Sequence, residues 1–267
     1  MKLTNFPHVY YITFEDSVNR QNYMEKQLNF LGVKNYTKIL AFDGRIHNYC
    51  EDQNVTGKFK HQLNSGQIAT TLSHLKAISE WYYHSDTPMA VFLEDDMNLN
   101  ICQYWNFTWD DIISRLNKQE WNCIQLSLQR CNDAEVPLDE EDIRLRRRSF
   151  YNWSAGSYIL KRQYAEKILN YYIDENNKVN LTVYECEDYI PYIENIIYIA
   201  GRPNEFTLPL FVEDVSHAST FYPAFAENTH IQCQIDSSEF VHNWWKNNGN
   251  SVNVDELLTP KNTRYWS

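Results

Sequence analysis

The stretch from Met89 to Met97 constrains the fold more than any other part of the chain. Five apolar residues, 89–93, follow a proline and end directly in three carboxylates, Glu94, Asp95 and Asp96. A short apolar run bounded in this way predicts a buried strand. Ligands of open α/β sheets gather at the carboxyl ends of strands, where these three acids fall. The stretch therefore predicts a strand whose end forms part of a binding site.

Three adjacent carboxylates repel one another and are costly to desolvate without a positive partner. A hard divalent cation, Mg²⁺ or Mn²⁺, is the simplest partner, because it prefers oxygen ligands and often shares them with phosphates. The alternative is a solvated turn with an acidic tip that serves only the end of the sheet. The apolar run in front of the acids favours the metal site.

Composition narrows the class of protein. The 267 residues suit one large α/β domain, and 43% hydrophobic residues are enough for a sizeable core. A net charge of −11 argues against nucleic-acid or anionic-membrane binding. No apolar run approaches the ~18 residues of a membrane span, and the N-terminus lacks the apolar core of a signal peptide. We therefore expect a cytoplasmic protein without a transmembrane segment. Its six scattered cysteines favour reduced thiols over zinc or disulfides.

Apolar periodicity predicts strands and helices in alternation. The expected strands are 9–14, 37–42, 89–93, 122–128, 157–160 and 195–200, and the expected helices are 17–31, 65–82 and one ending at 172. Strands separated by helices predict an α/β fold with a mostly parallel central sheet flanked by helices. The charged segment 133–148 predicts an exposed loop or hairpin. We expect residues 1–220 to form one domain, and the aromatic residues 221–267 to form an irregular tail or flap that packs on it.

Several short motifs follow one another in a recognisable order. They are VYYI at 9–12 with Arg20 downstream, AFDG at 41–44, GQI at 66–68 leading to LSH at 72–74, LEDD at 93–96, AGSYI at 155–159 and the acidic pair at 187–188. In order and spacing the chain resembles glycosyltransferase family 25 over about residues 8–220. That family includes bacterial lipooligosaccharide galactosyltransferases and procollagen galactosyltransferases. The chain departs from the family pattern at 13–15, at Gln67 and at 70–71, which leaves the donor sugar open.

The resemblance implies a GT-A-like (Rossmann-like) nucleotide-sugar fold. It also implies a metal-dependent enzyme that transfers a hexose, most often galactose, with inversion. The donor would be a UDP-sugar, UDP-galactose or UDP-glucose, bound with Mn²⁺ or Mg²⁺. The acceptor would be a hydroxyl of a glycan, a glycolipid or a hydroxylated protein, and no nucleic acid is expected as a partner. Two alternatives stay open: a catalytically silent carbohydrate- or protein-binding module, and a two-metal phosphotransferase or nuclease, which the acidic charge disfavours.

The resemblance also implies roles for the three acids. Asp96 is expected to touch the metal, Asp95 to bind the ribose or a metal-bound water, and Glu94 to hold the geometry. His217 is a second candidate metal ligand, since histidine joins carboxylates at Mn²⁺, and a lone surface histidine is the alternative. Asp188 is the candidate base, because inverting transfer needs a carboxylate on the face opposite the leaving group.

Other residues complete the expected site. Glu187 and Glu185 are alternatives to Asp188 as the base, and the acids there could instead serve a helix dipole. The remaining expected donor-binding residues are Thr13, Arg20, Asp43 and Gly156. Arg20 either neutralises the acids or contacts phosphate, or it is an exposed helix residue. Gly156 is expected to allow a close backbone approach, and His74 to satisfy a buried hydrogen bond.

Overall fold

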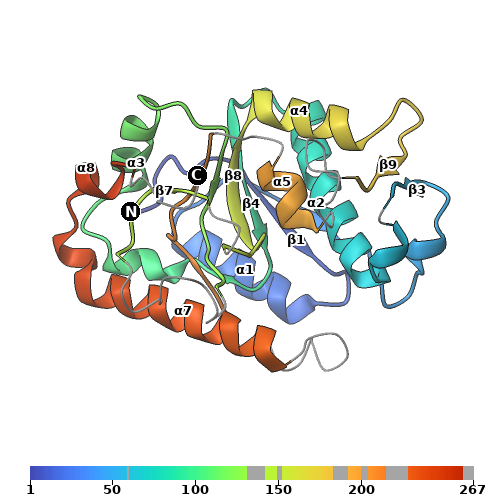
Figure 1. Cartoon of the computed structure of the whole chain (residues 1–267). Helices are drawn as coiled ribbons and strands as arrows, with labels where there is room; N and C mark the ends of the chain where they lie inside the picture. Colours follow the sequence, from blue (N-terminus) through green and yellow to red (C-terminus); the bar gives the residue numbers. More distant parts are fainter. Residues whose placement is uncertain are drawn as a thin grey trace, which may run out of the picture.

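The computed structural model describes residues 1–58, 60–130, 142–148, 152–182, 192–199, 204–214 and 228–260. Its centre is a seven-stranded mixed sheet (Figure 1), with the strands in the order β2-β1-β4-β8-β6-β10-β7. The strands are β1 (Val9–Thr13), β2 (Tyr36–Leu40), β4 (Met89–Glu94), β6 (Cys123–Gln125), β7 (Arg146–Arg147), β8 (Ser157–Lys161) and β10 (Glu205–Thr207).

Most strands of this sheet run in one direction. β1 pairs in parallel with β2 and β4, and β6 pairs in parallel with β10. β8 lies between β4 and β6 and is antiparallel to both, while β7 is antiparallel to β10 at the edge. Two small sheets pair β5 (Met97–Asn98) with β11 (Val212–Glu213), and β3 (Val55–Thr56) with β9 (Val179–Asn180). The expected mostly parallel central sheet is thus confirmed.

Helices cover both faces of the sheet (Figure 1). They are α1 (Val18–Phe30), α2 (Ser65–His84), α3 (Trp109–Leu116), α4 (Arg162–Tyr172), α5 (Ile193–Ile199), α7 (Asn228–Asn248) and α8 (Val254–Leu257), with short 3₁₀ turns at Tyr49–Glu51, Lys60–Gln62, Asn100–Tyr104 and Gly249–Ser251. α1, α3 and α7 share one hydrophobic cluster, and α2, α4 and α5 share the other. This layered arrangement confirms the α/β class expected from the sequence.

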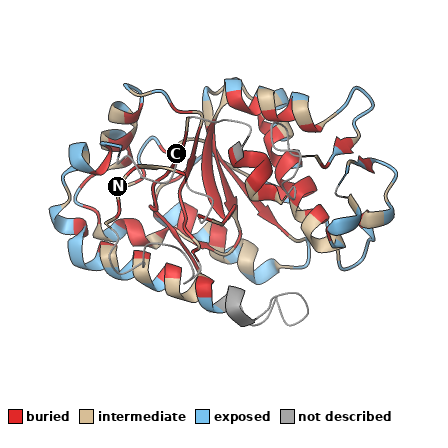
Figure 2. Ribbon diagram, in the orientation of Figure 1, coloured by how far each residue is buried: buried red, intermediate tan, exposed pale blue. Residues whose placement is uncertain are grey.

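The alternation of strand side chains explains why there are two clusters. Tyr11 and Val91 point into the cluster of α1, α3 and α7, whereas their neighbours Tyr10 and Phe92 point into the cluster of α2, α4 and α5. Successive strand residues face opposite sides of a sheet, so a strand covered on both faces is apolar throughout. The central strands are accordingly buried along their length (Figure 2). None of the helices in the described part of the chain is long and apolar enough to cross a membrane.

The long helix α2 begins where the sequence predicts. Asn64 accepts a hydrogen bond at its side-chain oxygen from the Gln67 backbone N–H (2.9 Å), and the Gln67 side chain accepts one from the Asn64 backbone N–H (2.9 Å). This reciprocal arrangement satisfies two backbone donors that a helix start otherwise leaves open. Ile68 and Leu75 on the apolar face are buried.

Two expectations about the later part of the chain are wrong. The run expected as a strand at 195–200 is helical over Ile193–Ile199. Its β-branched residues favour a strand, but Ile193, Ile196 and Ile197 are buried at helical spacing, and a short apolar run does not distinguish the two structures.

The tail is also more regular than expected, because Asn228–Asn248 forms the helix α7. Val241 and Trp245 on this helix are buried in the cluster that contains α1 and α3, and the Trp245 indole N–H donates to the Pro209 carbonyl at 2.8 Å. The domain boundary at residue 220 stays a prediction. Within the charged segment expected as a loop or hairpin, only residues 142–148 are described, and Arg146–Arg147 form β7.

Candidate active site

Three acids mark the carboxyl end of β4, at the centre of the sheet. Glu94 is the last residue of β4, and Asp95 and Asp96 follow it before β5. β1 is paired with β4 so that Ile12 lies opposite Glu94, which brings Thr13 next to Asp95. The Thr13 hydroxyl donates to Asp95 Oδ2 at 2.5 Å. The geometry of the sheet thus places Thr13 beside Asp95, and the donor-binding role expected for Thr13 stays a prediction.

Arg20, in the first turns of α1, is the cation at this site. Its Nη1 donates to Asp95 Oδ1 at 2.9 Å and lies 3.6 Å from Asp96 Oδ2. Only 14% of the Arg20 side chain is exposed. The alternative of an exposed helix residue is therefore wrong, and Arg20 neutralises part of the acidic charge. With Thr13 on one oxygen and Arg20 on the other, the orientation of the Asp95 carboxylate is fixed.

Asp96 is less well satisfied than Asp95. Its Oδ1 is buried and has no hydrogen-bond partner among the described residues. Burial is the largest cause that raises the pKa of Asp96 well above its usual range, followed by the charges of Glu94 and Glu213, while Arg20 opposes the shift. A buried acceptor without a partner is costly, so this oxygen suits a cation or a donor group of a ligand. Within the described residues, no group of three or more His, Cys, Asp or Glu side chains is placed to hold a metal ion.

Glu94 is held by His74 of α2, which lies on the face of the sheet opposite to α1 and Arg20. His74 Nε2 lies 3.2 Å from Glu94 Oε1, and His74 Nδ1 lies 2.9 Å from the Tyr158 hydroxyl. Burial lowers the pKa of His74 to about 4, so the imidazole is neutral near pH 7. Burial and the charges of Glu194 and Asp95 raise the pKa of Glu94 to about 7. The expectation that His74 makes a buried hydrogen bond is confirmed.

Gly156 lies directly against the acidic cluster, just before β8. Its carbonyl accepts from the Glu94 N–H at 2.8 Å. A Cβ at this position would lie 2.8 Å from Met97 Sδ and 3.1 Å from Glu213 Oε1. The expected close backbone approach is therefore present, and the neighbours are the strands β5 and β11.

The sequence reasoning missed two acids that lie near Asp96. Glu213 ends β11, and its neighbour Asp214 donates its backbone N–H to the Asp96 carbonyl at 2.6 Å. Asp214 is also hydrogen-bonded to Tyr23 of α1, whose pKa is raised by burial and then by Asp214. The only signal in the sequence is the acidic pair 213–214 after an apolar run, a weaker copy of the pattern at 93–96.

Asp43 lies at the same edge of the sheet, after β2, but has a different partner. Asp43 Oδ2 accepts from Arg45 Nη2 at 2.6 Å, and the same Nη2 lies 3.2 Å from Asp16 Oδ1. The Arg45 guanidinium also stands 4.4 Å from the centre of the Phe14 ring. No hydrogen bond or ion pair of the described residues joins Asp43 to Glu94, Asp95 or Asp96. The donor-binding role expected for Asp43 stays a prediction.

Four expected residues cannot be placed. Asp188 and Glu187, expected as the base and its neighbour, lie outside the described residues, as do Glu185 and the candidate metal ligand His217. Their roles stay predictions.

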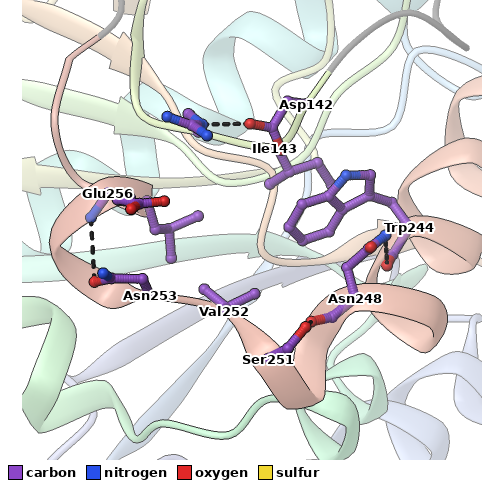
Figure 3. Close-up of a pocket in the computed structure, with 10 residues that line it drawn as sticks. Asp142, Ile143, Trp244, Asn248, Ser251, Val252, Asn253 and Glu256 are labelled. Atoms are coloured by element: carbon purple, nitrogen blue, oxygen red, sulfur yellow. Dashed lines mark hydrogen bonds and ion pairs between the residues drawn. The ribbon is translucent and has the colours of Figure 1, made fainter.

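A cavity of about 140 Å³ lies elsewhere, beside the C-terminal end of α7 (Figure 3). Its polar groups already bond to one another: Asn248 donates to the Trp244 carbonyl at 2.9 Å, and Asn253 accepts from the Asp255 N–H at 3.0 Å. Asp142 on its rim forms an ion pair with Arg144. None of the expected site residues lines it, so the acidic end of β4 is the better candidate.

Two solved structures match this chain at low sequence identity. The structure of A197 from STIV matches with a TM-score of 0.41 and 11% identity, over 78% of this chain and 84% of that one. The glycosyltransferase GlyE of Streptococcus pneumoniae TIGR4 matches with a TM-score of 0.37 and 8% identity, over 91% of this chain and 64% of that one. No curated protein sequence matches significantly.

The comparison with protein families is more informative. The model of glycosyltransferase family 25 (LPS biosynthesis protein) matches residues 6–183, which include Thr13, Arg20 and the three acids after β4. Since this match spans about two-thirds of the sequence, the chain belongs to glycosyltransferase family 25.

Proposed function

We propose that the protein is a metal-dependent glycosyltransferase that moves a hexose from a UDP-sugar to an acceptor hydroxyl with inversion. Galactose is the first sugar to test, and UDP-glucose is the second donor. The observation that supports this most is the acidic end of β4, where one oxygen of Asp96 is buried without a partner among the described residues. The family of the chain supports glycosyl transfer from a nucleotide-sugar donor.

The described residues of this site can supply some of the oxygen ligands that a divalent cation needs. Asp96 would bind it through the unpartnered Oδ1, and His217 and the phosphates of the donor are the proposed further ligands. Mn²⁺ or Mg²⁺ would supply positive charge to the diphosphate leaving group. The raised pKa of Asp96 and of Glu94 supports the need for added positive charge, because Arg20 faces several carboxylates.

The other residues of the cluster would orient the donor. Thr13 and Arg20 each occupy one oxygen of Asp95, and each carboxylate oxygen has a second lone pair. We propose that these remaining lone pairs accept a ribose hydroxyl or a metal-bound water. His74 would keep Glu94 in place through its neutral imidazole.

The acceptor side of the reaction is proposed from chemistry alone. A base must take the proton from the acceptor hydroxyl on the face opposite the leaving UDP. Asp188 is the proposed base, and Glu187 is its alternative. The acceptor is proposed to be a glycan, a glycolipid or a hydroxylated protein side chain.

One observation favours a second candidate, a catalytically silent carbohydrate- or protein-binding module. Arg20 already lies between Asp95 and Asp96, where it supplies some of the positive charge that a cation would bring. In such a module the acidic cluster would be a structural ion-pair network. The two candidates differ in whether a donor binds with a metal and is turned over.

Calorimetry with UDP separates these candidates. We expect UDP to bind in the presence of Mn²⁺ and to lose affinity by at least about tenfold in EDTA, because like charges must be bridged. Donor hydrolysis with UDP-galactose and UDP-glucose then identifies the sugar. Equal UDP affinity with and without EDTA would contradict the metal-dependent proposal. UDP binding without any donor hydrolysis or transfer would favour the silent module.

A further inference from the structure

A buried carboxylate outside the expected site, Glu213, is held from two sides. Only 8% of the residue is exposed. Its Oε1 accepts from the Ser154 hydroxyl at 2.6 Å, and its Oε2 accepts from Gln234 Nε2 at 2.5 Å. Ser154 precedes β8, whereas Gln234 belongs to α7, so one side chain ties two distant parts of the chain together.

Glu213 is also linked to the backbone at the acidic end of β4. β11 and β5 pair so that Glu213 lies opposite Met97, the residue after Asp96. Asp214, which directly follows β11, donates its N–H to the Asp96 carbonyl at 2.6 Å. A displacement of Glu213 would therefore be transmitted to Asp96 through the strand pair.

The Ser154 side of this arrangement is rigid. Ser154 has a φ of +93°, a conformation that residues with a side chain rarely adopt. Its hydroxyl donates to Glu213 and accepts from the Gly156 N–H at 3.0 Å, and it lies 2.9 Å from the Ser127 hydroxyl. Gly156 leaves no space for a Cβ between Met97 and Glu213. The strained turn thus holds one oxygen of Glu213 in a fixed place.

We propose that Glu213 and Gln234 form a pair that positions the donor site. The pair fixes the backbone at Asp96 and couples helix α7 to donor binding. The pair does not touch the reacting atoms. It acts through the β11–β5 ladder and through the Ser154–Gly156 turn. This inference rests on the proposed function, because it assigns the pair to the binding of a UDP-sugar.

The test measures UDP affinity by calorimetry with Mn²⁺, alongside a thermal melt. Gln234→Ala leaves Glu213 Oε2 without its donor, and we expect UDP to bind about 5–10-fold more weakly. The exchange Glu213→Gln with Gln234→Glu recreates the pair in reverse, and we expect it to restore affinity to within about threefold of wild type. Gln232→Ala is the matched control, because Gln232 is exposed on the same helix and bonds Asp236, at 2.6 Å, rather than Glu213.

Several results would overturn the inference. Wild-type UDP affinity in folded Gln234→Ala would show that the pair does not position the site. So would an exchange variant that binds UDP no better than Gln234→Ala. A loss of affinity in Gln232→Ala equal to that in Gln234→Ala would point to the helix as a whole. If Gln234→Ala does not fold, Gln234→Met keeps the volume without the amide and carries the same expectation. No UDP binding by wild type would overturn the proposed function and this inference with it, whereas the other results leave the proposed function standing.

Discussion

Arg20 and Arg45 both bind aspartates at the carboxyl edge of the parallel strands, but the two groups lie in different surroundings. The Arg20 side chain is 14% exposed and faces Asp95 and Asp96, with Glu94 and Glu213 nearby. The Arg45 side chain is 46% exposed and faces Asp43 and Asp16. The pKa of Asp96 is raised, chiefly by burial, while the pKa of Asp43 is lowered, chiefly by its hydrogen bonds to Arg45.

The difference between the two sites shows that the type of side chain alone does not determine the role of a charged group. At Arg45 the positive charge matches its closest carboxylate, Asp43, and the half-exposed guanidinium is also screened by water. At Arg20 the guanidinium meets several carboxylates in a place where water is scarce, and the pKa of Glu94 and that of Asp96 are raised. A raised carboxylate pKa next to an unpartnered oxygen is what an unfilled binding site for a cation or phosphate-bearing ligand produces.

The variant with the largest expected effect tests whether the acids after β4 and the catalytic base are different residues. We expect Asp188→Asn to lower transfer to the acceptor by about 10²–10⁴-fold, since a general base acts only on the acceptor hydroxyl. UDP affinity, measured by calorimetry on the same preparation, is expected to stay within about twofold of wild type.

Glu187→Gln is the matched control for this change. If Glu187→Gln loses transfer and Asp188→Asn keeps it, the base is the neighbouring carboxylate. If neither variant loses transfer, the acidic pair is structural, and one of the acids after β4 would have to be considered as the base.

A second prediction compares Asp96 and Asp43 directly. We expect Asp96→Ala to lower turnover by at least about 10²-fold, because it removes a group proposed to stabilise the leaving diphosphate through the cation. Asp43→Ala is expected to lower turnover by less than about tenfold. Removing the repelled Asp96 carboxylate should leave the thermal melt unchanged or raise it. Wild-type turnover in folded Asp96→Ala would reject the role assigned to Asp96, and equal losses in both variants would remove the contrast between the two groups.

A third prediction compares the two arginines through stability. We expect Arg20→Gln to lower the free energy of unfolding by about 2–4 kcal/mol at pH 7, because it leaves largely buried carboxylates without their cation. Arg45→Gln removes ion pairs whose arginine is 46% exposed, and it is expected to cost less than about 1 kcal/mol. Urea unfolding measures both.

Added Mn²⁺ provides a check on this comparison. It should restore part of the stability of Arg20→Gln and none of that of Arg45→Gln, since the cation is proposed to bind at the acids after β4 and not at Asp43 and Asp16. Equal losses in the two variants would show that burial does not separate the two arginine groups.

The smallest effect concerns pH. The folded protein raises the pKa of Glu94 and of Glu213 from 4.5 to about 7. Between these values the folded state holds protons that the unfolded chain has released, so the contribution of these groups is present at low pH and is lost as the pH rises to 7. We expect Glu213→Gln to gain stability relative to wild type as the pH rises from 4.5 to 7, in urea unfolding at a series of pH values.

Asp43 should behave in the opposite way. Its pKa is lowered from 3.8, so its contribution is present above pH 3.8 and is lost as the pH falls through the lowered value. Asp43→Asn should therefore differ from wild type above pH 3.8 and converge with it in acid. A Glu213→Gln difference that stays constant from pH 4.5 to 7 would contradict the raised pKa of Glu213.

The sequence predicts the local features of this fold well. Helical spacing and the Asn64 cap locate α2, and an apolar run ending in acids locates β4 and the site at its end. These signals are local, because helical periodicity and helix caps depend on residues that are close together in the sequence. Local signals failed at α5, where β-branched isoleucines at helical spacing allow either structure, and at α7, where the tail was expected to be irregular.

The sequence does not predict which residues complete the site. Arg20 meets Asp95 across 75 positions, and Ser154 meets Glu213 across 59. Such partners are decided by the order of strands in the sheet, which periodicity does not reveal. Glu213 and Gln234 were therefore missed, although both are ordinary residues of a strand and a helix. Asp188, Glu187 and His217 lie outside the described residues, so their predictions stay open.

The place of β8 between β4 and β6 has a consequence for the order of synthesis. β4 is complete at Glu94, but its antiparallel neighbour begins only at Ser157, about 60 residues later. A ribosome adding about 5–20 residues per second needs roughly 3–12 seconds to make that stretch. During this interval the apolar edge of β4 has no partner, and the Glu94 N–H has no Gly156 carbonyl to bind. The nascent chain therefore exposes one unpaired edge of this apolar strand, next to its acidic cluster, until the middle of the chain has emerged.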